Sequence, residues 1–404
     1  KLLNLGHKVA ICDQLEPPKT GKLVKRGITR ILTPGTLLED QQLDASSNHF
    51  LVALDLDKKA AFASWLDLST GKFNLTQSSN LQDFLSVLSA LSPREVLLPE
   101  SLSSKVAHWK ESDLFKDELE RILTDVTQTE RPDFDFDQKA GAREVMESLG
   151  VMNLEGFGIG LSHPGLGPAG ALLVYAQDVL KGKPGNLRKI EEFRDGESLL
   201  VDPSTQRNLE IFKTSAQSRK GSLLDSMDAT VSAGGARLLE AYLSSPQRDL
   251  TEIRRRQNCV SEFSTLPVVV DDVAGILKRG SDLERILGRL RNRLVRPREL
   301  GGLRATLRGL PGIRKTLEEV GGANKAIEAL ALKVETFDSL RALLEKALEE
   351  ELPADIKVDV KGEGGRVIRT GFDEHFDELR ELGRGGKRWI LELEASEREK
   401  TGIS

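Results

Sequence analysis

The sequence predicts a multidomain protein of mixed class, with α/β structure in its first part and an all-α region in its second. Short apolar runs separated by turn residues fill the segment before residue 100, which is typical of strands. Most of the segment after Pro168 instead has apolar residues three and four positions apart, which is typical of amphipathic helices. The length of 404 residues corresponds to roughly two to four domains.

The composition narrows the class of protein. Hydrophobic residues make up 39% of the chain and charged residues 30%, which is ordinary for a soluble globular protein. No apolar run reaches the roughly 18 residues that a membrane span requires. Cys12 and Cys259 lie far apart and the five histidines are scattered, so we expect no disulfide framework, no metal site and a reducing, cytoplasmic environment.

The two ends of the sequence lack terminal character. Residues 1–12 pass from a helix end into a strand without an initiator Met, and residues 394–404 stop within or just past a helical charge pattern. Natural termini usually carry a cap, a disordered tail or a change in composition. We therefore expect an internal piece of a longer protein.

Residues 1–36 are typical of the end of an α/β domain. They close with the turn Thr33–Thr36, in which Pro34 and Gly35 fit the two central positions of a type II turn. A polar linker, residues 37–48, follows.

The next region predicts a second α/β domain. Three strands, residues 50–57, 60–68 and 72–77, form a meander, and Asn80 caps a helix that ends at Pro93. A further strand covers residues 95–98. This β-β-β-α-β order is the opening of a ribonuclease-H-like domain, which we expect to end near Gly160.

The rest of the chain predicts helices. Residues 169–180 form a strongly apolar helix, which we assign to the helical region. A capping box begins at Ser281, an apolar stripe runs from Leu283 to Leu294, and Pro297 ends that helix.

Several collinear motifs carry a family resemblance. They are Val9–Gln14, Arg30–Thr36, Gly156–Gly158, Asp202–Glu210, Gly235–Leu239, Asp282–Leu287, Arg296–Arg298 and Glu397–Gly402. With them the chain resembles, over essentially its whole length, the bacterial MutS family of DNA mismatch-recognition proteins. Asp13, Gly234 and Tyr242 depart from residues common in that family, which puts only fine packing in doubt.

The resemblance assigns a role to each region. Residues 1–36 would be the C-terminal part of the mismatch-binding domain, 40–165 the ribonuclease-H-like connector, and 170–404 the helical core and lever domain, which ends at the start of the clamp. The family's Phe-x-Glu wedge would lie before Lys1, and the ATPase domain with most of the clamp after Ser404. The segment would therefore couple DNA binding to the ATPase.

The resemblance also implies partners and cofactors. The longer protein would be a cytoplasmic, nucleoid-associated, DNA-dependent ATPase that uses ATP and Mg, forms a homodimer, and binds a MutL-type repair protein and double-stranded DNA with mismatches or small loops. This segment would bind no cofactor and would be inactive as an enzyme alone.

A basic segment is the candidate DNA contact. Five cations and no acid lie between residues 17 and 32. Arg26 is the first choice for a contact with backbone phosphate because the resemblance places it at a basic position of the family, and Lys25 and Lys22 follow. We interpret Arg30 as a structural or salt-bridging residue. A solvated surface is an equally weighted interpretation, and for the arginines between Arg285 and Arg298 we favour ion pairs between helices.

Two further patterns suggest enzyme chemistry less strongly. Residues 165–170 match GxGxxG, but no clear strand precedes them and Pro168 removes a backbone donor, so a structural loop is favoured over a dinucleotide site. Asp55 and Asp67 on adjacent strands suggest a two-metal nuclease, but no further carboxylates accompany them. The alternatives to a DNA mismatch sensor are thus a ribonuclease-H-like nuclease or a helical scaffold without a DNA role.

Overall fold

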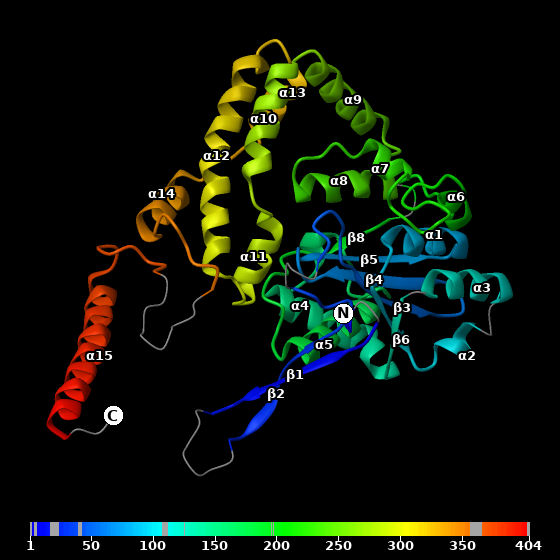
Figure 1. Ribbon diagram of the computed structural model, residues 1–404. Helices are drawn as coiled ribbons and strands as arrows, with labels where there is room; N and C mark the ends of the chain where they lie inside the picture. Colours follow the sequence, from blue (N-terminus) through cyan, green and yellow to red (C-terminus); the bar gives the residue numbers. More distant parts are fainter. Residues whose placement is uncertain are drawn as a thin grey trace. The chain divides into compact units, whose positions relative to one another are not determined.

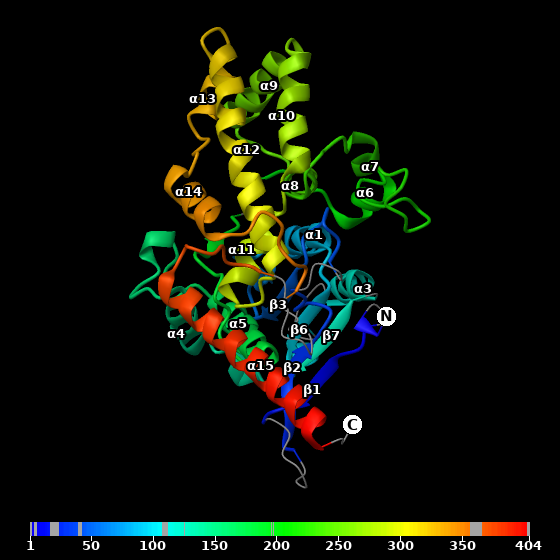
Figure 2. The ribbon, with the colours of Figure 1, turned by 60° about the vertical axis from the view of Figure 1, so that its left-hand side comes forward.

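The structure is a computed structural model, and it describes residues 2–3, 6–16, 24–38, 43–106, 112–124, 126–194, 196, 198–355 and 366–401. It forms two compact units (Figures 1 and 2). The first comprises Lys1–Asn258 and Leu287–Arg293, and the second comprises Cys259–Ile286 and Leu294–Ser404. The first is α/β and the second is helical, so the predicted order of fold classes is confirmed.

The chain begins with an antiparallel hairpin. Strands β1 (Val9–Gln14) and β2 (Arg26–Leu32) form a two-stranded sheet of their own, with a register shift between Ile11 and Cys12. In both ribbon views the hairpin extends away from the larger sheet (Figures 1 and 2). Its orientation therefore depends on contacts at its base.

The larger sheet has six strands in the order β7-β6-β3-β4-β5-β8. The strands are β3 (Leu51–Leu56), β4 (Ala61–Asp67), β5 (Lys72–Ser78), β6 (Glu95–Pro99), β7 (Thr127–Arg131) and β8 (Glu191–Glu192). The first three form an antiparallel meander, and β6 pairs parallel to β3, as the sequence predicted. Asn80 caps the intervening helix by accepting from the amides of Gln82 and Asp83, which confirms the expected start.

Helices cover both faces of this sheet. Helices α1 (Leu81–Leu91), α2 (Leu102–Val106) and α3 (Ser112–Leu123) share a buried cluster with Val52, Leu54 and Leu56, every second residue of β3. The remaining residues of β3 point to the opposite face because side chains alternate along a strand. Helix α5 (Leu166–Leu180) packs against β3 and β4 and also contacts α4 (Gln138–Leu149). The 3-10 turn Asp133–Phe136 precedes α4, and the 3-10 turn Glu155–Phe157 lies between α4 and α5 in the sequence.

The neighbours of helix α5 differ from what the sequence suggested. Most of this segment lies in the helical region expected to start at residue 170, yet the helix packs on the six-stranded sheet. Eleven of its residues are buried, around most of its circumference. A helix without a polar face gives no amphipathic stripe from which its neighbours could be inferred. Pro168 is accommodated because it lies in the first turn, where the N–H has no helical partner.

Three shorter helices also belong to the first unit, and α9 runs on into the second. Their bounds are α6 (Pro203–Asn208), α7 (Leu223–Met227), α8 (Ala233–Ser244) and α9 (Leu250–Ser264). Asp202, Ser222 and Ser232 cap the first three by accepting a backbone N–H, the arrangement that stabilises exposed helix starts.

The second unit is built around one long helix. Helix α12 (Pro297–Gly321) packs against α10 (Pro267–Arg279), α13 (Lys325–Ala331) and α14 (Asp338–Ala347), and α15 (Glu374–Thr401) follows. One buried cluster contains Leu303 and Leu307 of α12, and another contains Ile313 and Leu317. Pro311 lies between the two clusters.

The boundary between α11 and α12 also differs from the prediction. Helix α11 (Leu283–Arg291) ends before Leu294, and Pro297 is the first residue of α12 instead of the end of α11. A proline at the first helical position needs no N–H partner, so the same residue can start a helix as readily as it stops one. The predicted capping box is replaced by Asp282, whose Oδ1 accepts from the amide of Arg285 at 3.4 Å.

Candidate nucleic-acid interface

The candidate DNA contacts lie at the start of β2. Arg26 and Lys25 are exposed, and the described part of the chain holds no ion pair of either side chain. The amide of Lys25 donates to Glu16 Oε1 at 3.0 Å, which closes the strand ends. Arg30 is half-buried and already engaged in a contact, in keeping with its structural interpretation. Lys22, the third candidate, lies outside the described residues.

Both ends of this hairpin meet one buried carboxylate. Glu95, the first residue of β6, is fully buried. On the side of β2, its Oε2 accepts from Thr33 Oγ1 at 2.5 Å and from the amide of Gly35 at 3.0 Å. On the side of β1, Lys8 Nζ lies 3.7 Å from its Oε1 and donates to Thr129 Oγ1 at 2.8 Å.

The same carboxylate is also held within its own domain. Its Oε1 accepts from Thr129 Oγ1 at 2.7 Å and from the hydroxyl of Tyr175 at 2.6 Å. Burial, together with the adjacent Glu95 charge, raises the pKa of Tyr175, so the phenol stays protonated and donates. Four donors therefore satisfy a carboxylate that would otherwise be costly to bury.

The turn after β2 differs in type from the prediction. The amide of Thr36 donates to the carbonyl of Thr33 at 3.2 Å, so the four-residue turn is present. Gly35 does not have the positive φ that a type II turn requires. Glycine is needed here because an added Cβ would lie 2.7 Å from the Cβ of Glu95. Close approach to the buried strand β6, and not backbone torsion, explains the residue.

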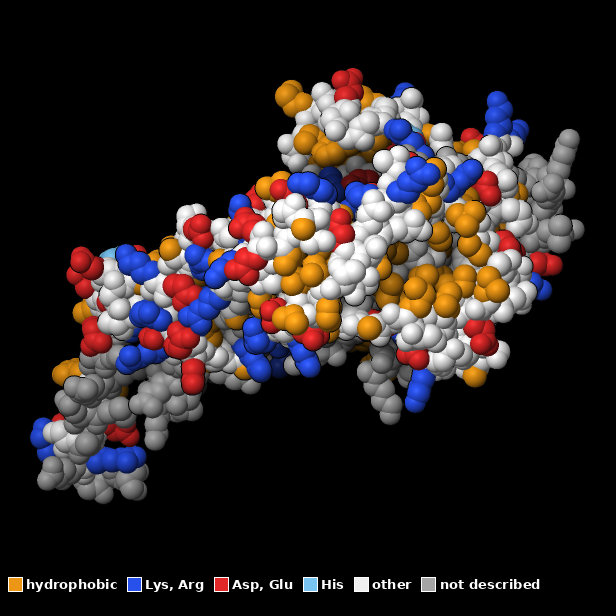
Figure 3. All heavy atoms as spheres, turned by 90° about the horizontal axis from the view of Figure 1, so that it is seen from above, with side chains coloured by type: hydrophobic (Ala, Val, Ile, Leu, Met, Phe, Trp, Pro, Cys, Tyr) orange, Lys and Arg blue, Asp and Glu red, His pale blue; other side chains and the backbone are white. Residues whose placement is uncertain are grey.

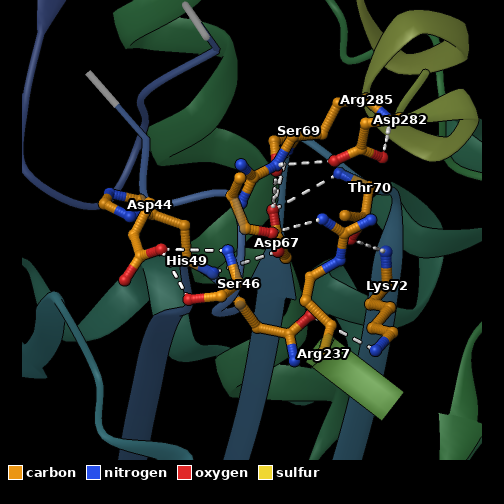
Figure 4. A network of polar contacts seen from close by, with 12 residues as sticks. Asp44, Ser46, His49, Asp67, Ser69, Thr70, Lys72, Arg237, Asp282 and Arg285 are labelled. Atoms are coloured by element: carbon orange, nitrogen blue, oxygen red, sulfur yellow. Dashed lines mark hydrogen bonds and ion pairs between the residues drawn. The ribbon is translucent and has the colours of Figure 1, made fainter. Parts of the chain in front are cut away.

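A second buried carboxylate organises the end of β4. Asp67 accepts from the amide and the hydroxyl of Ser69, at 2.9 and 2.6 Å, and from the amide of His49 at 3.0 Å (Figure 4). Arg237 is 1% exposed, points toward Asp67 in this view, and donates to the carbonyl of Ala45 at 3.0 Å. These contacts fix the loops at that edge of the sheet.

The arrangement of Asp55 and Asp67 opposes the nuclease hypothesis. Each lies near the C-terminal end of its strand, and because β3 and β4 are antiparallel the two lie at opposite edges of the sheet. Lys105 Nζ contacts Asp55 at 2.5 Å, and burial raises the pKa of Asp55. In the described part of the chain no group of three or more His, Cys, Asp or Glu side chains could hold a metal ion.

The GxGxxG segment is a packing device. A Cβ at Gly167 would lie 2.3 Å from the carbonyl oxygen of Phe136, and one at Gly170 would lie 2.4 Å from the Cα of Gly141. The segment starts helix α5, and backbone from the 3-10 turn Asp133–Phe136 and from α4 lies directly against it. The structural interpretation of this motif is therefore the one that the geometry supports.

Outside the hairpin, the described residues do not form a single basic surface. Arg285 and Arg289 are buried, so neither presents a guanidinium to a phosphate backbone, and Arg285 lies 3.8 Å from Asp282. On the face drawn in Figure 3, basic and acidic side chains are intermixed over much of the visible surface. None of the described helices is both long enough and apolar enough for a membrane span.

Comparison with protein families places the chain. Residues 1–41 match the model of MutS domain I, residues 49–191 that of MutS domain II, and residues 204–399 that of MutS domain III. The chain belongs to the MutS family. The matched segments follow the resemblance noted in the sequence, while the predicted domain limits at residues 36, 40, 165 and 170 stay predictions. The domain II match does include helix α5.

Individual relatives agree with this assignment. The chain is similar to DNA mismatch repair protein MutS of Symbiobacterium thermophilum, with 36% identity over all of this chain and 45% of the relative. The corresponding proteins of Myxococcus xanthus and Methanothrix thermoacetophila are 33% and 34% identical, with 44% and 43% of their lengths covered. The chain thus spans less than half the length of these relatives.

The role of Glu95 is not apparent from the sequence. Its partners come from residues 33, 35, 129 and 175, which no local pattern connects. The available signal was an acidic residue at the head of a wholly buried strand, because a charge in such a place needs donors.

Proposed function

We propose that this chain is the mechanical middle of a DNA mismatch sensor that initiates mismatch repair. In this proposal the hairpin β1–β2 contributes phosphate contacts, the connector, which is the domain II region 49–191, links it to the helices, and the helices couple DNA binding to an ATPase domain of the longer protein. The observation that carries the proposal is the collinear match to MutS domains I, II and III.

The proposal extends to partners of the longer protein. They are double-stranded DNA with mismatches or small loops, a MutL-type repair protein and a second copy of the chain, with ATP and Mg as cofactors and a cytoplasmic, nucleoid-associated location. The relatives are named DNA mismatch repair proteins, which supports the proposal that the longer protein binds mismatched DNA. The exposed, unpaired Arg26 and Lys25 support a phosphate contact within the described residues.

The first prediction concerns Arg26. In the protein extended to the length of its relatives, Arg26→Ala is expected to weaken binding of matched and mismatched duplex alike by about 1 kcal/mol and to make the salt slope shallower by roughly one. A phosphate contact carries no sequence information, which is why both duplexes should be affected equally.

Titration of both duplexes at several salt concentrations tests it. Lys58→Ala, which removes an equal charge from an exposed connector turn, is the matched control and should leave affinity unchanged. A loss confined to mismatched DNA, or no loss at all, would refute the role of Arg26.

A second prediction concerns nucleotide. The 404-residue chain alone is expected neither to bind ATP tightly nor to hydrolyse it, because its sequence has no GxxxxGK[ST] phosphate-binding loop. Equilibrium dialysis with ATP and Mg, together with a phosphate-release assay, measures both properties. Saturable ATP binding with protein-dependent phosphate release would contradict the proposal that these functions reside in another domain.

The nuclease alternative has less support. It would need carboxylates that converge on shared metal ions, whereas Asp55 and Asp67 lie at opposite edges of the sheet. A helical scaffold without a DNA role stays open as a second candidate, and equal DNA affinity of the wild-type protein and Arg26→Ala at every salt concentration would favour it.

A further inference from the structure

We propose that Glu95 is a positioning residue, which fixes the orientation of hairpin β1–β2 relative to the connector and so determines where Arg26 meets the DNA. The orienting role is a property of this chain. Its effect on DNA rests on the proposed function, and the two are tested separately below.

The hairpin has no shared strand pairing with the connector. Strands β1 and β2 form a separate two-stranded sheet, so no ladder of the six-stranded sheet orients them. Contacts at the base must do so instead, and β2 also packs against α5. Packing of apolar side chains is non-directional, whereas hydrogen bonds to a carboxylate have defined geometry.

Glu95 supplies such contacts at both ends of the hairpin. Lys8 directly precedes β1, and Thr33 directly follows β2. Through the 3.7 Å ion pair to Lys8 and the 2.5 Å hydrogen bond from Thr33, one carboxylate holds the entry and the exit of the same hairpin. Two attachment points restrict rotation about an axis that a single attachment would leave free.

The anchor is itself rigid. Glu95 lies in a strand paired on both sides, with Leu51 of β3 and Thr127 of β7. Thr129 and Tyr175 hold its other oxygen, and Gly35 leaves no space between the turn and the Glu95 Cβ. A movement of the hairpin would therefore have to break several charge-assisted hydrogen bonds within a buried site.

The orienting role can be measured without DNA. Spin labels at Ile28, which is 54% exposed on β2, and at Met152, which is 97% exposed in the connector, would report their separation by pulsed electron resonance, with Cys12 and Cys259 replaced by Ser. We expect one narrow distance distribution for the otherwise unchanged chain and a clearly broader one for Glu95→Ala.

Further variants separate orientation from stability. Glu95→Gln is expected to broaden the distance distribution less than Glu95→Ala does. The side-chain oxygen of the glutamine can still accept from the amide of Gly35, and its NH₂ group faces hydroxyls that are able to accept. Thr33→Val, which removes a single donor, should behave like Glu95→Gln and serves if Glu95→Ala does not fold. Asp55→Ala is the matched control, because it breaks the Lys105 pair at the far end of β3 and leaves the hairpin untouched. It should destabilise the connector without broadening the distances.

The effect on DNA is tested in the protein extended to the length of its relatives. Glu95→Ala should weaken matched and mismatched duplex by about fivefold, comparable with a loss of about 1 kcal/mol for Arg26→Ala. The double variant should lose little more than either single variant, because a misplaced hairpin already forfeits the Arg26 contact.

The outcomes are distinguishable. Unbroadened distances in Glu95→Ala, or equal broadening in Asp55→Ala, would overturn the positioning role whatever the DNA titrations give. Broadened distances with unchanged affinity in Glu95→Ala, while Arg26→Ala binds more weakly, would overturn the link to DNA and leave the proposed function intact. Failure of Arg26→Ala to affect binding would instead count against the proposed function, and the distances would still decide the role of Glu95.

Discussion

Replacing Gly141 with alanine is expected to destabilise the connector by roughly 3 kcal/mol or more, at the upper end of the cost of overpacking a core. The new Cβ would lie 2.0 Å from the carbonyl oxygen of Leu166 and 2.8 Å from its carbonyl carbon. Both belong to backbone, so no rotation of a side chain relieves the clash, and α4 and α5 must move apart. The gain of about 1 kcal/mol in helix propensity does not offset this cost.

The matched control is Gly156→Ala in the same domain, because no atom lies within 4 Å of the position that its Cβ would take. Its stability should stay within about 0.5 kcal/mol of the parent. Urea titration followed by the fluorescence of buried Trp65, with Trp109 and Trp389 replaced by Phe, measures both variants. Equal midpoints for the two alanine variants would show that α4 and α5 do not pack through Gly141.

In the second unit, the largest single loss is expected for Arg304→Ala, at about 3–4 kcal/mol. Arg304 is 3% exposed, and its guanidinium donates to the carbonyls of Leu348, Glu349 and Glu350 at 3.1, 2.8 and 2.7 Å. These acceptors directly follow α14, where carbonyls have no partner within the helix. Truncation to alanine leaves three carbonyl acceptors without their donor and opens a cavity. It also removes a positive charge that stabilises the C-terminal end of helix α14.

Arg308→Ala provides an internal contrast one turn along α12. Arg308 contacts the carboxylates of Glu345 and Glu350, and these partners raise its pKa, yet its side chain is 43% exposed. Solvent screening and side-chain entropy reduce such a pair to at most about 1 kcal/mol. Hydrogen exchange of α12 and α14 should therefore rise strongly in Arg304→Ala and little in Arg308→Ala. The reverse order would show that exposed charge pairs dominate this contact.

Local signals were sufficient for much of the connector. Strands β3, β4 and β5 were predictable because short apolar runs and the turn residues between them lie within short segments, and Asn80 caps its helix as expected. The neighbours of α5 could not be predicted, for a physical reason. Its burial is set by a sheet and by α4, and a helix that is apolar around most of its circumference does not indicate which neighbours surround it.

The candidate site was predictable only in part. Composition was enough to mark the basic segment between residues 17 and 32, whereas Arg26 was chosen within it because it matches a basic position of the MutS family. Glu95 could not be found in this way, because hydrogen bonds bring its partners together across separations of 62 and 80 residues in the case of Thr33 and Tyr175. Pro297 was misread since proline is compatible with both the end and the beginning of a helix.

Pro311 makes helix α12 easier to bend at one position than elsewhere along its length. Proline supplies no N–H to the preceding turn, and helices bend at such positions more easily than elsewhere. The two halves of the helix pack into separate buried clusters, which hold each half in place, so bending is confined to the segment between Leu307 and Ile313. A change of 10° there would displace the first turn of the helix, roughly 20 Å away, by about 4 Å. A small angular change at one residue thus becomes a translation the size of a side chain.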